Sequence, residues 1–188
     1  SRDMTAPPRP SEVADEPVRK APEQVWGGRY DEIEVRSGEE GQTVTLVPVE
    51  ATGHFTVVIN DVENLEENYD LSASISGMAE SYSPASGDMT GEKVTFPLSL
   101  EYTDSHTLTA CFYSFGHCPT EEGVHIFSVY TSEKIYYNFD VTGQLHEAAD
   151  PHNILIVING LKLPTAQTGM SPSVDDWSDV EDIYIEMQ

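Results

Sequence analysis

Four side chains that can hold a metal ion fall in one short stretch of the chain, namely Cys111, His117, Cys118 and His125. Thiolate and imidazole groups are the usual ligands of zinc, and structural zinc sites favour paired ligands about two to four residues apart. This stretch lacks such a pairing. We therefore expect no metal site here, and the sequence predicts no cofactor elsewhere.

The two cysteines leave two interpretations open. If Cys111 ends one strand and Cys118 begins the next, their Cα atoms could approach to about 6 Å, the distance that a disulfide requires. Disulfides are common in exported proteins. The alternative is two free thiols, with Cys111 packed as a small apolar residue on a strand.

Acidic residues are densest near the C-terminus, around Trp177. Asp175, Asp176 and Asp179 are the weak calcium candidates in this stretch. Calcium needs about six to eight converging oxygen ligands, and the spacing of an EF-hand loop is absent. The alternative interpretation is a solvated acidic turn that Trp177 anchors.

The chain carries no motif for catalysis. It contains no nucleophile elbow, phosphate-binding loop or zinc-protease helix motif. Carboxylates are frequent, but a catalytic pair requires a defined separation that a sequence does not show. We expect a protein that is not an enzyme and that has no catalytic residues.

Several aromatic side chains could instead stack on sugar rings: Trp26, Tyr113, Tyr130, Tyr136 and Tyr137. In a β-sandwich most such residues belong to the core or to cross-strand pairs. A surface glycan-binding module is therefore our alternative hypothesis, and it predicts a row of exposed aromatics on one sheet face.

The charge of the chain limits its partners. The 33 acidic residues outnumber the 9 lysines and arginines, which gives a net charge of -24. Binding of nucleic acid requires a basic patch, and anionic membrane surfaces attract cationic segments. We therefore expect neither partner.

The elements that would position these residues are short strands. Alternating apolar residues predict strands over 33–36, 43–49, 54–60, 93–102, 106–115, 124–131, 135–141 and 180–187, with a shorter one over 71–75. Residues 154–158 form an unbroken apolar run typical of a strand that is covered on both faces. Residues 43–60 predict a hairpin, residues 77–91 an irregular loop, and residues 144–149 one helical turn.

This pattern predicts an all-β sandwich of about seven to nine strands. Pro97 indicates an edge strand or a bulge. Residues 1–24 contain five prolines and few apolar residues, so we expect an extended polar arm before a sandwich domain over 25–188. That arm is either a tether or a segment that docks on a sheet edge.

Three segments carry a family resemblance: FDVTGQ at 139–144, NILIVINGLKLP at 153–164 and PSVDDW at 172–177. Together with TVTLVPV at 43–49, SISGMA at 74–79 and FYSFG at 112–116, they resemble a domain of the fimbrillin-like surface lipoproteins of Bacteroidales and of their fimbrial anchor subunits. The resemblance covers about residues 25–188. It implies a transthyretin-like or immunoglobulin-like β-sandwich, and it implies no catalytic residues.

The resemblance also implies an exported lipoprotein on the outer membrane or cell surface, reached through a lipidated leader that this chain lacks. Its partners would be other fimbrial or surface subunits, or a second domain of the same protein. Our first hypothesis is therefore a structural or adhesion subunit that assembles through β-strand pairing. The edge residues we expect to pair are Ile33, Val35, Ile183 and Ile185.

Overall fold

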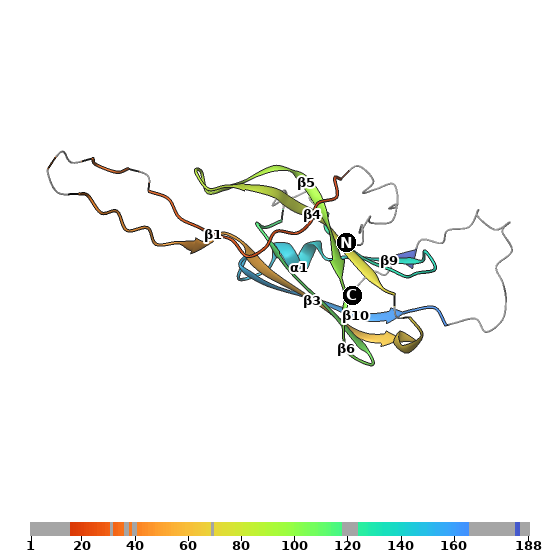
Figure 1. Cartoon of the computed structure of the whole chain (residues 1–188). Coiled ribbons are helices and arrows are strands. Elements are labelled where there is room, and N and C mark those ends of the chain that lie inside the picture. The colour runs from red at the N-terminus through yellow and green to blue at the C-terminus, as the bar shows by residue number, and fades with distance from the viewer. Residues whose placement is uncertain are drawn as a thin grey trace.

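Two β-sheets packed face to face form the body of the protein (Figure 1). The computed structural model describes residues 16–30, 32–35, 38, 41–68, 70–117, 124–165 and 183–184. The all-β sandwich that the sequence predicts is confirmed. Among the described residues, no helix is long and apolar enough to span a membrane.

The first sheet has four strands in the order β10-β3-β7-β6. Its strands are β3 (Gly53–Glu63), β6 (Glu101–Asp104), β7 (Thr107–Ser114) and β10 (Asn153–Lys162). Strand β3 pairs antiparallel with β7 and parallel with β10. Strands β10 and β6 are therefore the edges of this sheet.

The second sheet has five strands in the order β11-β9-β8-β4-β5. They are β4 (Ser72–Ser83), β5 (Asp88–Ser99), β8 (Ile126–Tyr130), β9 (Tyr136–Asp140) and β11 (Ile183–Tyr184). Strand β11 runs parallel to β9, and the other neighbours are antiparallel. Strand β5 lies at the opposite edge.

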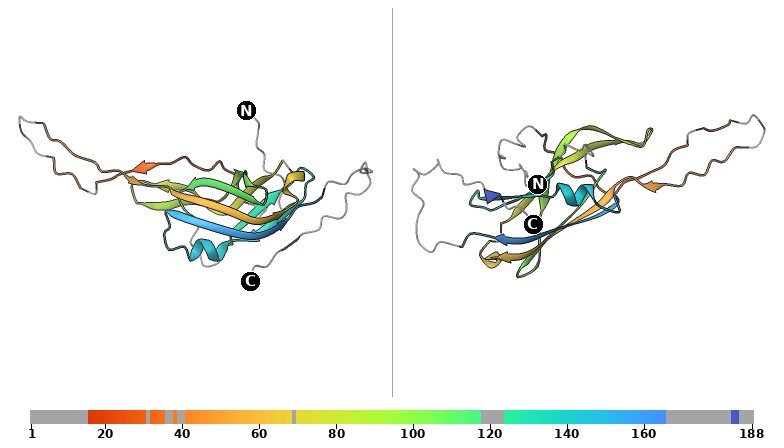
Figure 2. Two further views of the ribbon diagram at one scale, coloured as in Figure 1. Left: turned by 90° about the horizontal axis from the view of Figure 1, so that it is seen from below. Right: turned by 180° about the vertical axis from the view of Figure 1, so that it is seen from behind.

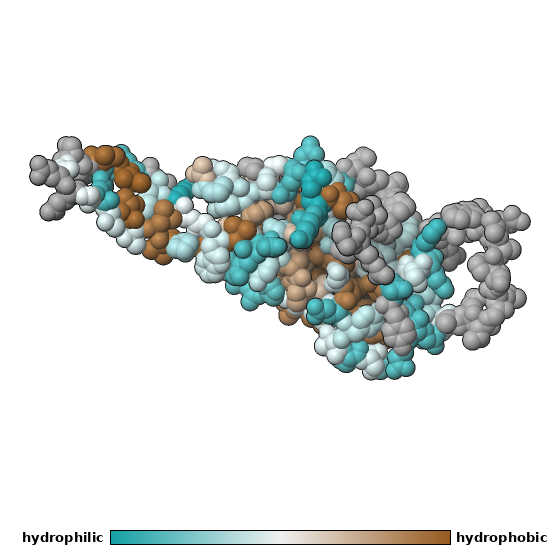
Figure 3. All heavy atoms as spheres, viewed as in Figure 1, coloured by the Kyte–Doolittle hydropathy of each residue, from teal (hydrophilic) through white to brown (hydrophobic). Residues whose placement is uncertain are grey.

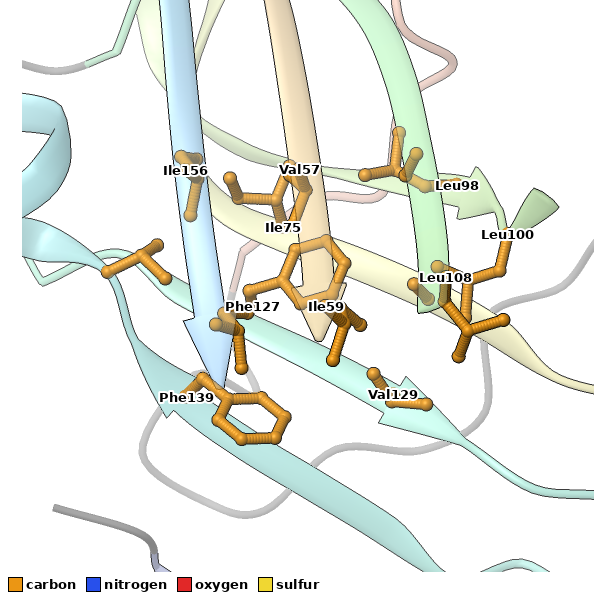
Figure 4. Packing of buried hydrophobic residues seen from close by; sticks show 14 of the residues in the cluster. Val57, Ile59, Ile75, Leu98, Leu100, Leu108, Phe127, Val129, Phe139 and Ile156 are labelled. Carbon is orange, nitrogen blue, oxygen red and sulfur yellow. The ribbon is translucent and has the colours of Figure 1, made fainter. Parts of the chain in front are cut away.

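The core lies between the sheets, where alternate side chains of both sheets meet (Figure 4). Val57, Ile59 and Ile156 come from the first sheet, and Phe127 and Phe139 from the second; all five are fully buried. The period-two alternation that predicts β3, β7 and β9 follows from this one-sided burial, because successive side chains of a strand point to opposite faces.

Two short helices connect the strands. The 3₁₀-helix η1 spans Leu65–Glu67, and helix α1 spans Thr142–His146. Helix α1 connects β9 to β10, near the helical turn predicted over 144–149. Its Leu145 side chain is buried in the core, so one residue of this single turn fixes it to the sandwich.

A two-stranded ribbon over residues 25–50 extends away from the sandwich (Figure 2). It contains β1 (Trp26–Gly27) and β2 (Val49–Glu50), which pair antiparallel. The predicted hairpin over 43–60 is wrong, because β2 pairs with β1 and β3 pairs with β7 and β10. The strands expected over 33–36 and 43–49 lie in this ribbon, and of the described residues in these two ranges only Val49 belongs to a strand.

Two predictions about burial are wrong. Residues 154–158 are not covered on both faces, because β10 is an edge strand and Leu155 is 59% exposed. Tyr102 does not face the core at the end of one long strand. The chain leaves β5 at Ser99 and enters β6 of the other sheet, where Tyr102 is exposed. The edge position predicted from Pro97 is confirmed, since β5 ends the five-stranded sheet.

The irregular loop predicted over 77–91 is also wrong, because this stretch forms most of the β4–β5 hairpin. Gly77 interrupts the pairing at a bulge between Ile75 and Met78, with a positive φ of 76°. The end of the hairpin is exposed, so its residues show no apolar alternation from which a strand could be predicted. The glycine- and serine-rich composition of this stretch is typical of loops, and so the sequence did not indicate a strand pair.

Candidate functional site

The ribbon of residues 25–50 is an extended segment of two limbs that projects from the sandwich (Figure 2). Its base is fixed to the sandwich, since Val25 donates its backbone N–H to Thr52 Oγ1 at 3.0 Å and accepts one from Ala51 at 2.8 Å. Farther out, the Tyr30 hydroxyl donates to the carbonyl of Thr45, and Gln42 Nε2 donates to the carbonyl of Glu34 at 2.7 Å. The two limbs therefore lie side by side along the ribbon.

Large apolar side chains are exposed along this ribbon beside polar ones (Figure 3). None of the ribbon's described residues belongs to the hydrophobic core. Nine large apolar side chains are exposed: Val25, Trp26, Tyr30, Ile33, Val35, Val44, Leu46, Val47 and Val49. Val35 is 85% exposed and Val47 is 75% exposed. An exposed apolar surface of this extent typically marks a site of protein contact.

Regular strand pairing is sparse in the ribbon. Among its described residues, the only strand pairing is that of Trp26–Gly27 with Val49–Glu50. The described residues of the outer limbs form no regular ladder. An extended chain of this kind can pair with a strand from another chain, whose backbone supplies hydrogen bonds and whose surface covers alternate side chains.

The predicted assembly residues fall in two places. Ile33 and Val35 lie on the outer part of the ribbon, exposed by 50% and 85%. Ile183 lies on β11 and pairs with Tyr137 of β9. Ile185 lies outside the described residues. The sequence thus indicated two positions on the ribbon, although it predicted them on an edge of the sandwich.

The end of the N-terminal arm docks on the edge strand β5. Val18 forms a parallel bridge with Thr95, and Arg19 N–H donates to the carbonyl of Thr95 at 3.0 Å. Glu16 Oε2 accepts from Gly77 N–H at 3.0 Å and from the Thr95 hydroxyl at 2.9 Å. Over residues 16–19 the docked interpretation of the arm therefore describes the structure. The division at residue 24 stays a prediction.

The opposite sheet edge, β10, carries a side-chain cap. Gln144 of helix α1 donates Nε2–H to the carbonyl of Val157 at 3.0 Å, and its Oε1 accepts the N–H of Val157 at 2.7 Å. The amide thus satisfies both backbone groups that a neighbouring strand would use at that residue. Covered edges of this kind prevent unwanted pairing between sheets.

Three histidines form a second distinctive site. His117 follows β7 and bridges Met78 of β4, His125 directly precedes β8, and His146 ends α1. Their potential ligand nitrogens all lie within 4.8 Å of one another. The sequence indicated His117 and His125 as metal-ligating side chains but not His146, because His146 lies in a different segment with no local spacing signal.

His125 is the buried centre of this cluster. It is 0% exposed, and its Nδ1 lies 3.2 Å from the carbonyl of Ser76. Burial, partly offset by this hydrogen bond, lowers the pKa of His125 from 6.5 to about 4. The imidazole is therefore neutral near pH 7.

The remaining predicted site residues give no further cluster. Cys111 is exposed on the outer face of β7, with its thiol 3.9 Å from Thr56 Oγ1. Cys111 is a free thiol and Cys118 lies outside the described residues, so the choice between a Cys111–Cys118 disulfide and two free thiols stays open. Asp175, Asp176 and Asp179 also lie outside them, and so the calcium hypothesis stays open.

The aromatic residues that we considered for glycan binding do not share one exposed face. Tyr130 and Tyr137 are buried, at 4% and 6% exposure. Tyr113 and Tyr136 are half-buried, and Tyr113 lies against His54. Trp26 is 57% exposed, but it lies on the ribbon. These five positions therefore provide no flat aromatic platform.

The fold and the ribbon define a β-sandwich with a projecting two-stranded extension. Residues 5–99, half of the 188-residue chain, match the family described as "Domain of unknown function (DUF5119)", and the chain belongs to this family. No curated protein matches the sequence.

Solved structures share the fold. A "putative adhesin" from Bacteroides ovatus aligns with a TM-score of 0.57 and 18% identity, covering 77% of this chain and 60% of the other. A second "putative adhesin" from Bacteroides ovatus gives 0.50 and 11%, covering 77% and 53%.

The fimbrial anchor protein Mfa2 from Porphyromonas gingivalis gives a TM-score of 0.46 and 17% identity, covering 72% of this chain and 51% of the other. The chain therefore spans between about half and three fifths of the length of these three structures. The resemblance to Bacteroidales surface proteins predicted from the sequence is confirmed at the level of the fold.

Proposed function

We propose that this protein is a non-enzymatic structural or adhesion subunit of the cell surface that assembles through its ribbon. The ribbon pairs with a neighbouring protein subunit of the same surface assembly, fimbrial in type. The single observation that carries this proposal is the set of nine exposed apolar side chains on an extension whose described residues contribute nothing to the hydrophobic core.

Physical chemistry supports a protein partner for this surface. Covering one exposed valine or leucine side chain contributes about 1.5–3 kcal/mol. Val35, Val47 and Val49 alone, at 85%, 75% and 64% exposure, would thus contribute several kcal/mol once a partner covers them. The net charge of -24 disfavours nucleic acid and anionic lipid as occupants, whereas β-strand addition needs only backbone groups and apolar pockets.

Three of the sheet edges are covered or charged, which makes them poor sites for pairing with another chain. Gln144 covers the middle of β10, and residues 17–19 cover Thr95 on β5. Strand β6 is short and fully exposed, with Glu101 and Asp104 at its ends. Compared with these three sheet edges, the ribbon is therefore better suited to pairing with another chain.

The fold relatives support the type of role. Two of the aligned structures are named adhesins, which favours a surface protein that contacts other macromolecules and catalyses no reaction. We extend to this chain the cell-surface location and the removed lipidated leader that the family resemblance implies.

A matched pair of substitutions tests this function. Val47→Ser removes an apolar side chain from the ribbon, and Leu155→Ser removes a similar one, 59% exposed, from β10 of the sandwich. Each variant replaces the parent in the producing cell, and the mass of the surface complex that contains it is measured by gradient sedimentation. We expect Val47→Ser to release the protein as a free chain and Leu155→Ser to leave it in the complex. Equal sedimentation of the two variants would overturn the proposal.

A further inference from the structure

The histidine cluster has the geometry of a metal centre. The three ring centroids are 5.0, 5.1 and 5.1 Å apart, nearly an equilateral triangle. Three imidazole nitrogens at about 2.0–2.1 Å from one ion, at tetrahedral angles, place the ring centroids about 5 Å apart. Ordinary packing of histidine rings does not require three equal separations.

The distance between one pair of histidine nitrogens agrees with tetrahedral coordination. His125 Nε2 and His146 Nε2 are 3.1 Å apart, close to the separation of about 3.3 Å between two ligands of a tetrahedral zinc ion. His146 is exposed at the end of α1, so its side chain has room to complete the coordination. Without a metal, this distance corresponds to a hydrogen bond in which one Nε2–H donates to the other Nε2.

The tautomer of His125 is set by its backbone partner. A carbonyl only accepts hydrogen bonds, so the 3.2 Å contact between His125 Nδ1 and Ser76 O places the proton on Nδ1. The Nε2 atom then presents a lone pair towards His146. A histidine that binds a metal through Nε2 usually donates its Nδ1–H to a neighbouring acceptor such as a backbone carbonyl, which fixes the orientation of the ring.

The fold around His125 is built to hold this ring in place. A Cβ on Gly77 would lie 2.3 Å from His125 Nδ1, so the glycine of the β4 bulge leaves the space that the ring fills. The backbone N–H of His125 donates to Thr142 Oγ1 at 2.8 Å, and its carbonyl accepts from Val141 at 3.0 Å. Backbone and side chain are both fixed before any ligand binds.

We propose that His117, His125 and His146 bind one divalent transition-metal ion of the zinc class. Three neutral imidazoles suit Zn²⁺, Ni²⁺ or Cu²⁺, whereas Mg²⁺ and Ca²⁺ prefer oxygen ligands. Three protein ligands leave a fourth position for water or another donor. The ion would join the segment after β7, the start of β8 and the end of α1. This inference is independent of the role proposed for the ribbon.

The test is zinc titration of the full chain after treatment with EDTA. Isothermal calorimetry with ZnCl₂ should give one saturable site, and one equivalent of zinc should raise the melting temperature. His146→Ala removes an exposed ligand, and it should weaken zinc binding by at least about 100-fold, more than the loss of a group that only hydrogen-bonds to a ligand. His117→Ala provides a second variant with the same expectation.

His152→Ala is the matched control, because His152 is an exposed histidine in the turn before β10. It should bind zinc like the parent chain. The melting temperature of each variant in EDTA confirms that it is folded. Absence of saturable zinc binding by the parent would overturn the proposal, as would parental affinity in both His146→Ala and His117→Ala.

Discussion

Gln144 caps Val157 as a neighbouring strand would, with Nε2 donating to the carbonyl at 3.0 Å and Oε1 accepting the N–H at 2.7 Å. Gln144 is the last residue of the FDVTGQ segment, and Val157 lies in NILIVINGLKLP. Two of the segments that carry the family resemblance thus meet at this contact. In the same segment, Thr142 holds the backbone of His125.

Replacing Gln144 by alanine should lower the free energy of unfolding by about 1–3 kcal/mol, because two backbone groups of β10 lose their partners. Urea denaturation measures this loss. Gln24→Ala is the control, since Gln24 makes an exposed side-chain bond to Glu50 and should change stability by less than about 0.5 kcal/mol. Equal effects of the two substitutions would show that Gln144 does not stabilise the edge.

Gly77→Ala should destabilise the protein strongly. A residue other than glycine at a φ of 76° costs about 1–3 kcal/mol, and the added Cβ would also displace the His125 ring. Gly143→Ala is the matched control, because a Cβ there meets nothing within 4 Å on helix α1 and should raise stability by about 0.5–1 kcal/mol. Thermal unfolding of both variants distinguishes a specific role of Gly77 from a general effect of the added methyl group.

Glu16→Ala should lower stability by about 1–3 kcal/mol, because Glu16 accepts two hydrogen bonds that join the arm to β4 and β5. Deleting residues 1–24 should lower the melting temperature in the same way. Glu23→Ala, at an exposed position of the same segment, serves as the control. An unchanged melting temperature after the deletion would mean that the arm is only a tether.

The Cys111–Cys118 disulfide can be tested directly by mass spectrometry of peptides from the oxidised chain. The disulfide interpretation predicts one peptide pair that carries the bond and separates on reduction, whereas two free thiols predict none. Cys111 is exposed, so alkylation without reductant is the complementary assay. Full alkylation of both thiols in unreduced protein exported to an oxidising compartment would refute the bond.

The sequence predicted the strands that are buried on one face, because burial of one face produces alternating apolar and polar residues. It did not predict the β4–β5 hairpin, where Gly77 provides a bulge rather than a turn and the exposed tip carries no apolar pattern. It also placed Ile33 and Val35 on an edge of the sandwich. Alternation alone does not show whether an apolar face meets the core of its own chain or a surface that another chain covers.

The histidine cluster shows the other limit of sequence analysis. His117, His125 and His146 come together because β7 ends near β4, β8 starts beside the bulge at Gly77, and α1 ends at the same place. No pairwise spacing encodes this meeting. His117 and His125 lie in the short stretch that contains both cysteines, which is why they were considered as metal ligands. His146 lies outside that stretch, and its position in the sequence gives no sign of the contact.

The most direct test of the account is site-specific photo-cross-linking in the producing cell. A photoreactive phenylalanine analogue replaces Val35 or Val47 on the ribbon, and Leu155 on β10 as the control, since all three side chains are more than half exposed. We predict that both ribbon positions form one discrete adduct with a surface protein subunit, identified by mass spectrometry, and that position 155 does not. Adducts of equal yield at all three positions, or none from the ribbon, would contradict assembly through this segment.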